Sequence, residues 1–438
     1  MMTSARSVAL QTLIKVLNNN SYSNIVLNNA LEKSNLSHTD KALATKIVYG
    51  TIQYKIYLEY QLKPLIKTRL KDKFIKPLLL MSAYQYFFLE KVPTNAIFDE
   101  ANKLAKSFGK KNSGSYRLVN GILRSLDRRG EILPQKQDEI KYLSVKYSYP
   151  EWLVKYLIEQ FGSKTGPEIL ESGNKAIPVS IRITANGQLQ EVEQALTKEK
   201  FEYRLTPLTD HNLFVHPGQV VKTDLFKEGK ITIQDSAASL AVDAFDFNGD
   251  EKVLDACAAP GGKTVQIAEH LITGTVTALD IHENKLSLIK NAAKRLKVSE
   301  KVKTKACDAR LAKDYFSQKQ FDKILVDAPC SGLGLIRRKP EIRYEKSLAD
   351  IEHLSKIQLD ILNSVAPLLV ENGELVYSTC TITKQEDEDV VENFLQMHPD
   401  FELTTIQVGN LDKQKMVKIL PNQYDSDGFF IAKFIKRG

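Results

Sequence analysis

The stretch Lys252-Val-Leu-Asp-Ala-Cys-Ala-Ala-Pro-Gly-Gly-Lys-Thr264 has the pattern of a short strand, a turn of small residues and the start of a helix. Small residues in such a turn let the backbone approach a ligand at a helix N-terminus. A P-loop is excluded because Cys257 stands where that motif needs glycine, and the dinucleotide pattern G-x-G-x-x-G is absent. The stretch therefore favours a nucleotide-like ligand that needs no diphosphate cradle.

The sequence after this stretch alternates between strand and helix patterns. Strands are predicted at residues 252–256, 275–281, 302–307, 321–326 and 373–378, and helices at 263–271, 283–296 and 348–370. This alternation predicts an α/β fold with a mostly parallel sheet and helices on both faces. Ligands of such sheets bind beyond the carboxyl ends of the strands, so the loops there are the candidate site.

Three aspartates come at the ends of successive predicted strands: Asp280, Asp308 and Asp327. One such residue often only caps the next helix. Three of them around one glycine-rich loop indicate a binding site, and a carboxylate in the position of Asp280 can accept hydrogen bonds from both hydroxyls of a ribose.

Two cysteines follow predicted strand ends, in Asp327-Ala-Pro-Cys330-Ser-Gly332 and Ser378-Thr-Cys380-Thr381. Cys307 fits an inert buried thiol, whereas two thiols at one sheet edge suggest covalent chemistry or redox exchange. Redox exchange favours C-x-x-C spacing, which the sequence lacks. The same lack of paired cysteines predicts no metal site.

Residues 1–130 have helical periodicity and contain 21 Lys and Arg against 8 Asp and Glu, whereas the rest of the chain is slightly acidic. An all-α segment with this charge suggests a docking domain for nucleic acid, although a solvated lysine-rich surface has the same composition. Helices are predicted at 99–108 and 117–126, with Pro64, Pro77 and Pro93 near helix boundaries.

The segment between these two regions has mixed patterns. Residues 131–137 lose periodicity and are predicted to be a linker, and a helix starts at Pro150. Strands are predicted at 178–184, 202–205 and 213–215, with a helix at 190–198. We therefore expect three domains: helical residues 1–130, a small α+β domain at 138–235, and the α/β domain at 236–438.

The overall composition is that of a soluble globular protein. The chain has 438 residues, 43% hydrophobic and 26% charged, with a net charge of +8. Its longest mostly apolar run, residues 77–89, is too short to cross a bilayer, and the N-terminus has no secretory signal pattern. We expect a cytoplasmic protein, monomeric and without membrane contact.

The motifs at 257–264, 327–332 and 378–380 together resemble those of the S-adenosylmethionine-dependent RNA cytosine-C5 methyltransferases. Val92-Pro93, Asp99-Glu-Ala101 and Val119-Asn-Gly-Ile-Leu-Arg124 resemble a NusB-like RNA-binding domain. The combination resembles the bacterial members that act on 16S (small-subunit) ribosomal RNA. Residues 150–235 resemble, more loosely, the RNA-recognition-motif-like extension of this family, with Thr184 where the family usually has Asn.

The resemblance implies a Rossmann-like C-terminal domain, S-adenosylmethionine as cofactor and 16S ribosomal RNA as partner. It implies that Cys380 attacks C6 of the cytosine and that Cys330 assists release, an order that the residues alone leave open. The residues expected to bind the cofactor lie in the loop and at the strand ends: Cys257, Ala258, Ala259, Pro260, Gly261, Gly262, Lys263, Asp280, Asp308 and Asp327.

Further roles and functions follow from the same residues. Asp327 is expected to hold the cytosine edge, and Arg337-Arg-Lys339 to contact RNA phosphates. The alternatives are methylation of a cytosine in tRNA or 23S ribosomal RNA, an enzyme of this fold acting on another acceptor, and a non-catalytic RNA-binding assembly factor. The last would tolerate a damaged loop or a missing cysteine, and neither is seen.

Overall fold

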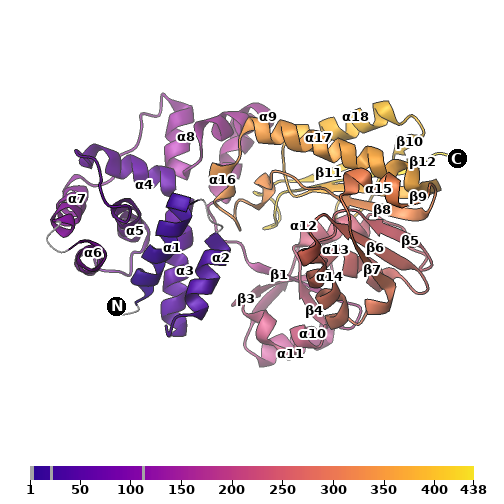
Figure 1. Ribbon diagram of the computed structural model, residues 1–438, viewed down its shortest axis with the longest axis horizontal. Coiled ribbons are helices and arrows are strands. Elements are labelled where there is room, and N and C mark those ends of the chain that lie inside the picture. Colours follow the sequence, from indigo (N-terminus) through magenta and orange to yellow (C-terminus); the bar gives the residue numbers. More distant parts are fainter. Residues whose placement is uncertain (1–3, 20–22, 111–113) are drawn as a thin grey trace. The chain divides into compact units, whose positions relative to one another are not determined.

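The computed structural model describes residues 4–19, 23–110 and 114–438, which form two compact units (Figure 1). The first unit extends to Asn174 and the second begins at Lys175. The first unit is helical. Its helices are α1 (Ala5–Asn19), α2 (Ser23–Glu32), α3 (His38–Gln53), α4 (Lys55–Leu62), α5 (Ile75–Phe88), α6 (Thr94–Phe108), α7 (Ser115–Arg129), α8 (Glu139–Tyr147) and α9 (Glu151–Ser172).

Three prolines of the first unit lie at or near helix boundaries. Pro64 follows the end of α4, Pro77 lies in the first turn of α5, and Pro93 caps α6. These positions suit proline, which lacks a backbone N–H, because the N–H groups of the first helical turn have no hydrogen-bond acceptor within the helix.

The compact first unit is larger than the helical domain predicted for residues 1–130. The segment 131–137 has no helix or strand, as expected of a linker, but it is hydrogen-bonded to α4: the Gln61 amide donates to the carbonyl of Ile132. After α8, the Ser148 hydroxyl accepts from the backbone N–H groups of Ile56 and Tyr57. These bonds hold α8 and α9 in the helical unit, whereas the sequence grouped them with the small α+β domain.

The second unit contains a small antiparallel sheet with strand order β2-β3-β1-β4. The strands are β1 (Val179–Ile183), β2 (Glu202–Leu205), β3 (Asn212–His216) and β4 (Ile231–Ile233). Helix α10 (Leu189–Lys198) packs its buried residues Val192 and Leu196 against this sheet, and α11 (Asp224–Lys227) adds Leu225. The predicted α+β pattern is confirmed here, with β4 as an additional strand.

The larger sheet of the second unit has eight strands, in the order β10-β12-β9-β8-β5-β6-β7, with β11 paired to β12. Strands β9, β8, β5, β6 and β7 are parallel, and β12 joins them antiparallel. Their bounds are β5 (Lys252–Asp255), β6 (Thr275–Asp280), β7 (Val302–Ala306), β8 (Phe321–Asp327), β9 (Leu369–Thr379), β10 (Phe401–Leu403), β11 (Met416–Ile419) and β12 (Phe429–Lys436).

Helices cover both faces of this sheet (Figure 1). They are α12 (Ser236–Asp243), α13 (Gly262–His270), α14 (Glu283–Arg295), α15 (Ala312–Tyr315), α17 (Leu348–Val365) and α18 (Glu388–Met397), whereas the short α16 (Ile342–Glu345) lies away from the sheet. Alternate strand residues enter opposite cores, as the pleat requires: Leu254 packs in the core with α17 and α18, and Val253 in the core with α12, α13 and α14. The predicted α/β architecture is confirmed.

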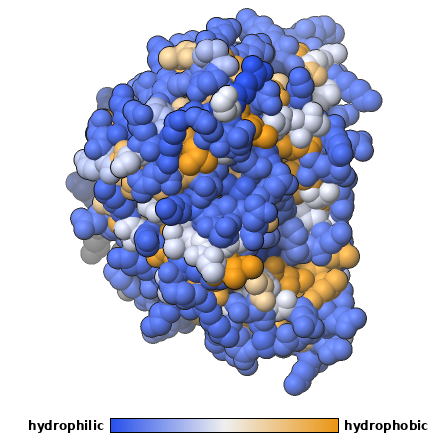
Figure 2. All heavy atoms as spheres, turned by 90° about the vertical axis from the view of Figure 1, so that its right-hand side faces the viewer, coloured by the Kyte–Doolittle hydropathy of each residue, from blue (hydrophilic) through white to orange (hydrophobic). Residues whose placement is uncertain are grey.

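Two parts of this region differ from the prediction. The helix expected at 348–370 ends at Val365, because Pro367 follows and Leu369 already begins β9. The strands β10, β11 and β12 were not predicted. The face of the second unit drawn in Figure 2 is mostly hydrophilic, with hydrophobic residues in separate groups, as on a surface exposed to water.

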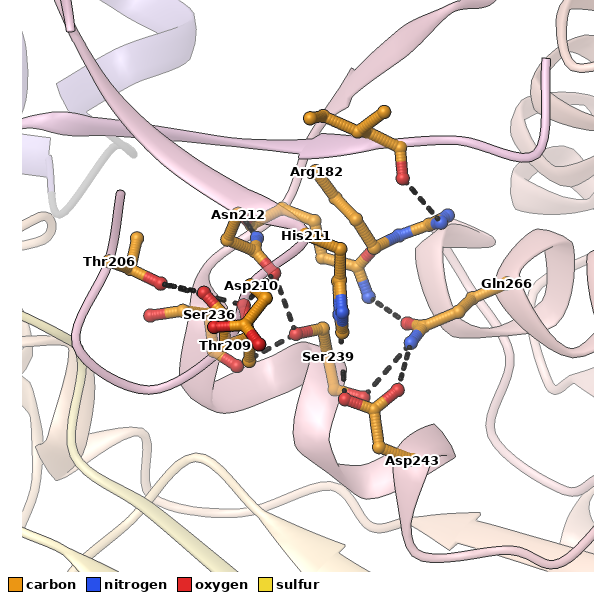
Figure 3. A network of polar contacts seen from close by, with 12 residues as sticks. Arg182, Thr206, Thr209, Asp210, His211, Asn212, Ser236, Ser239, Asp243 and Gln266 are labelled. Atoms are coloured by element: carbon orange, nitrogen blue, oxygen red, sulfur yellow. Dashed lines mark hydrogen bonds and ion pairs between the residues drawn. The ribbon is translucent and has the colours of Figure 1, made fainter. Parts of the chain in front are cut away.

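A polar network joins the small sheet to α12 and α13 (Figure 3). Arg182 of β1 donates to Glu269 of α13 at 2.5 Å and to the amide oxygen of Gln234 at 2.7 Å. Figure 3 shows His211 pointing toward Asp243 of α12, with 3.4 Å between Nε2 and Oδ2. Because these bonds are largely buried, they fix the small sheet to the sheet that carries the candidate site.

Candidate active site

The glycine-rich loop joins β5 to α13 and is held on both sides by neighbouring strands. The N–H of Ala256 donates to the carbonyl of Leu325 in β8, and the N–H of Ala258 donates to that of Leu279 in β6. Gly261 has a φ of 105°, and a Cβ there would lie 2.9 Å from Cα of Ile289. Only glycine fits both the backbone conformation and the close packing.

This loop opens onto a cavity of about 440 Å³ at the carboxyl ends of the parallel strands. Strands β6 and β7 lie on one side of β5, and the next strand of the chain, β8, lies on its other side. Open α/β sheets bind ligands at such a change of side, here between β5 and β8. The predicted residues that line the cavity are Cys257, Ala259, Asp280, Asp308, Asp327, Cys330 and Cys380. Ala258, Pro260, Gly261, Gly262 and Lys263 support the loop or the start of α13 without lining the cavity.

Three of the aspartates predicted to bind a ligand line the cavity. Asp280, at the end of β6, accepts from the N–H of His282, and Asp308 makes a two-pronged ion pair with Arg310. Burial, together with nearby carboxylates, raises the pKa of the Cys257 thiol well above its usual range. Cys257 is therefore a neutral part of the cavity wall.

Asp327 is held from both of its oxygens. Lys263 Nζ lies 2.8 Å from Oδ2, and the Ser378 hydroxyl donates to Oδ1 at 2.9 Å. Lys263 comes from the start of α13 and Ser378 from β9, so three elements fix this one carboxylate at the cavity wall. The lysine thus has a partner inside the site rather than a position on the surface.

The two cysteines lie in contact. The Sγ atoms of Cys330 and Cys380 are 3.1 Å apart, because the adjacent parallel strands β8 and β9 end three and one residues before them. The hydrogen bond with Cys380, burial and the charge of Cys380 all raise the pKa of the Cys330 thiol well above its usual range. Cys330 therefore stays protonated near neutral pH, and either sulfur can be the donor in this contact.

Glu386 holds the two cysteine loops together and was not predicted. Its buried carboxylate accepts from the N–H of Ser331, beside Cys330, and from the hydroxyls of Thr381 and Thr383, beyond Cys380. Gln358 of α17 donates to the same carboxylate and to the carbonyl of Pro329. The sequence signal that could have identified Glu386 is an acidic residue soon after the Ser-Thr-Cys-Thr motif.

Two arginines predicted to contact RNA are also paired within the protein. Arg338 binds both oxygens of Asp427 and one of Asp235, and Arg337 donates to the carbonyl of Pro421. Lys339, the third member of this run, is exposed. The reason is the tertiary fold, which brings a turn some 90 residues away against this loop.

Thr184, where the family usually has Asn, is buried in the small sheet. Its hydroxyl donates to the carbonyl of Gly229 at 2.5 Å. This side chain therefore has a partner within its own sheet.

In residues 4–19, 23–110 and 114–438, no group of three or more His, Cys, Asp or Glu is arranged to hold a metal ion. Within the same ranges, every helix is too short or too polar to cross a membrane.

Comparisons with known proteins agree with this geometry. Residues 242–435 match the family model "16S rRNA methyltransferase RsmB/F", and residues 3–128 match the NusB family. The chain is 40% identical to the probable ribosomal RNA small subunit methyltransferase B of Bacillus subtilis, covering 100% of this chain and 99% of that one. It is 33% identical to the ribosomal RNA small subunit methyltransferase B of Serratia proteamaculans, over 98% of each chain.

Solved structures show the same fold. The crystal structure of PH0851 covers 100% of both chains with a TM-score of 0.82 and 25% identity. A methyltransferase homologue from Pyrococcus horikoshii covers 68% of this chain and 99% of its own, with a TM-score of 0.58 and 26% identity. The resemblance drawn from the motifs is confirmed: this chain belongs to the RsmB/F family of 16S rRNA methyltransferases and carries an N-terminal NusB-family domain.

Proposed function

We propose that this chain transfers a methyl group from S-adenosylmethionine to C5 of a cytosine in 16S ribosomal RNA, through a covalent bond between Cys380 and C6 of the base. The observation that carries the proposal is the pair of thiols 3.1 Å apart at one end of the cavity, beside an aspartate held by a lysine. C5 of cytosine is too weak a nucleophile to take a methyl group directly, so a thiol that adds to C6 is needed.

The carboxylate side of the cavity suits the cofactor. When bound, S-adenosylmethionine supplies a methyl group on a positively charged sulfur, which the surrounding carboxylates stabilise. Asp280 and Asp308 both line the cavity, and we expect Asp280 to accept from the ribose hydroxyls and Asp308 to contact the adenine side. Cys257 and Ala259 also line the cavity.

We expect the two thiols to act in different steps: Cys380 forms the bond to the base, and Cys330 removes the proton from C5. The Sγ of Cys380, as thiolate, bonds to C6, which places electron density on C5 for the incoming methyl group. Once Cys380 is a thioether, it no longer carries the charge that holds the proton on Cys330. Cys330 can then lose that proton to solvent and take the proton from C5 as the bond between Sγ and C6 breaks.

Asp327 orients the base. Its carboxylate, fixed by Lys263 and Ser378, is expected to accept from the exocyclic amine of the cytosine. The target base must be unpaired or flipped out of a helix to enter, at a cost of a few kcal/mol.

Cysteine variants test this proposal directly. We expect Cys380→Ser to form no RNA adduct and no product. We expect Cys330→Ser to attack and methylate but to stall before release, leaving an RNA-dependent complex that survives denaturing electrophoresis. Cys307→Ser changes a buried thiol that lines the same cavity outside the pair; as the thiol control it should neither trap an adduct nor abolish the product.

The product is measured by bisulfite sequencing of 16S ribosomal RNA treated with each variant. An adduct trapped in Cys380→Ser and absent in Cys330→Ser would reverse the two roles. No adduct in either variant, or methylation outside C5 of cytosine, would refute the covalent mechanism.

A further inference from the structure

Helix α7 presents a line of arginines on its exposed face. Positions 117, 121, 124 and 128 are all exposed, and their spacing places them on one face of the helix. The opposite face is buried in the first unit through Val119, Ile122, Leu123 and Leu126. We call the exposed set, Arg117, Gly121, Arg124 and Arg128, the α7 stripe.

The arginines of the α7 stripe are not neutralised by acids. In the part of the chain that the structure describes, each contacts a neutral oxygen on its own helix: Tyr116 for Arg117, Asn120 for Arg124 and Ser125 for Arg128. The acid on this helix, Asp127, is hydrogen-bonded to Tyr86. Arg129, in contrast, is held by Gln61 and the carbonyl of Gly130 and is not part of the stripe.

Gly121 lies in the middle of the stripe without a structural reason for being glycine. Glycine is the poorest helix former after proline, so a glycine inside a helix usually permits close packing. Here a Cβ would meet no atom within 4 Å. What the missing side chain does leave open is an approach of something outside the protein to the helix backbone, between the arginines.

The positive charge continues onto α6. Lys106 Nζ lies 4.9 Å from the ring centre of Tyr116, and the guanidinium of Arg117 lies 5.7 Å from it. The hydrogen bond from Arg117 and the charges of Arg117 and Lys106 lower the pKa of Tyr116. An aromatic ring between two cations thus borders one end of the stripe.

We propose that the α7 stripe binds the phosphodiester backbone of the RNA substrate, with a phosphate seated over Gly121. The inference rests on the proposed function, since it takes RNA as the substrate. Guanidinium groups bind phosphate oxygens through paired N–H donors, and the stripe runs for roughly 16 Å along the helix, which spans several nucleotides. Phosphate contacts of this kind give affinity and position rather than base recognition.

The first test compares two triple variants of the full-length protein. Arg117→Gln, Arg124→Gln and Arg128→Gln together remove the stripe's charge. Lys15→Gln, Lys33→Gln and Lys46→Gln remove an equal charge from exposed positions elsewhere in the same unit. Binding to a 16S ribosomal RNA fragment is measured over a series of salt concentrations. We expect the stripe variant to bind at least about 10-fold more weakly, with a salt slope lower by about 2, and the control to change much less.

The second test changes shape without charge. Gly121→Leu should weaken RNA binding about 10-fold while the thermal unfolding midpoint stays the same or rises, because leucine favours the helix and meets no neighbour. Normal RNA binding by Gly121→Leu, or equal losses in the two triple variants, would overturn the inference. So would competition for the stripe by polyglutamate but not by RNA, which would indicate an acidic protein partner.

The outcomes separate this inference from the proposed function. Under both, the stripe variants should still methylate RNA when it is saturating. A wild-type protein that methylates RNA while the stripe variants bind it normally refutes the inference alone. A wild-type protein that neither binds nor methylates RNA refutes the proposed function as well.

Discussion

Glu386 is fully buried, and its carboxylate accepts hydrogen bonds from the loops that follow both β8 and β9. Its backbone carbonyl also accepts from the hydroxyl of Tyr377, in the strand that ends at the second cysteine loop. A buried carboxylate is stable only when several donors satisfy it. Glu386 therefore fixes the separation of the two thiols through the two loops rather than by contact with a substrate.

Replacing this carboxylate by its amide should slow the chemistry and spare binding. In Glu386→Gln the side-chain amide places N–H donors against the donors that the carboxylate now accepts, which displaces the cysteine loops. A displacement of about 1 Å in an active site can cost about 100-fold in rate, so we expect single-turnover methyl transfer to fall about 10- to 100-fold.

The affinities of Glu386→Gln for S-adenosylmethionine and RNA should stay within about 2-fold of wild type, measured by calorimetry and filter binding. Asp389→Asn, which changes an acid paired with Lys384 at the surface, is the control. Wild-type rates in Glu386→Gln would show that this carboxylate does not position the thiols.

At the scale of elements, the sequence predicted the parts of the site whose pattern is local. The strand ends at Asp280 and Asp327 were predicted, because apolar runs and the following turns mark them. Glu386 and the pairing of Arg338 with Asp427 were not, because their partners are far apart in the chain and nothing local records the contact. The C-terminal strand β12 was missed for the same reason, since it is defined by pairing with β9.

The junction in Figure 3 contains two groups whose titrations oppose each other. Burial raises the pKa of Asp243 from 3.8 to about 7, against the pull of Arg182 and Gln266. Burial, with the charges of Arg182 and His270, lowers the pKa of His211 from 6.5 to about 4, and Asp210 opposes this. A group whose pKa is raised by folding contributes stability at low pH, and that contribution is lost as the pH rises through the folded-state pKa. A group whose pKa is lowered by folding contributes stability at high pH, and that contribution is lost as the pH falls through the folded-state pKa.

Two variants should reveal these opposite slopes. The advantage of wild type over Asp243→Asn in free energy of unfolding should shrink as the pH rises from about 4 to about 7. Its advantage over His211→Gln should shrink as the pH falls from about 6.5 to about 4. Urea unfolding at a series of pH values measures both, and parallel stability curves for all three proteins would contradict the assignment.

For the whole molecule, charge and chemistry are divided between the two compact units. Residues 1–174 contain 26 Lys and Arg against 15 Asp and Glu, whereas residues 175–438 contain 35 against 38. All four cysteines and the candidate cofactor loop lie in the second unit. A basic unit beside an acidic one suggests that the first supplies RNA affinity and the second supplies the reaction.

Removal of the first unit should separate these two contributions. A chain that begins at Lys175 should bind S-adenosylmethionine with wild-type affinity in calorimetry, because every residue of the cavity is retained. Its RNA affinity should fall at least about 10-fold and depend less on salt, because fewer phosphates are neutralised. A cut at residue 130 is a poorer test, since α8 and α9 would lose the bonds that Ser148 makes to α4.

Undiminished RNA affinity in the shortened chain would place the RNA contacts in the second unit. If the shortened chain loses affinity and the α7 stripe variant does not, the first unit binds RNA through a different surface.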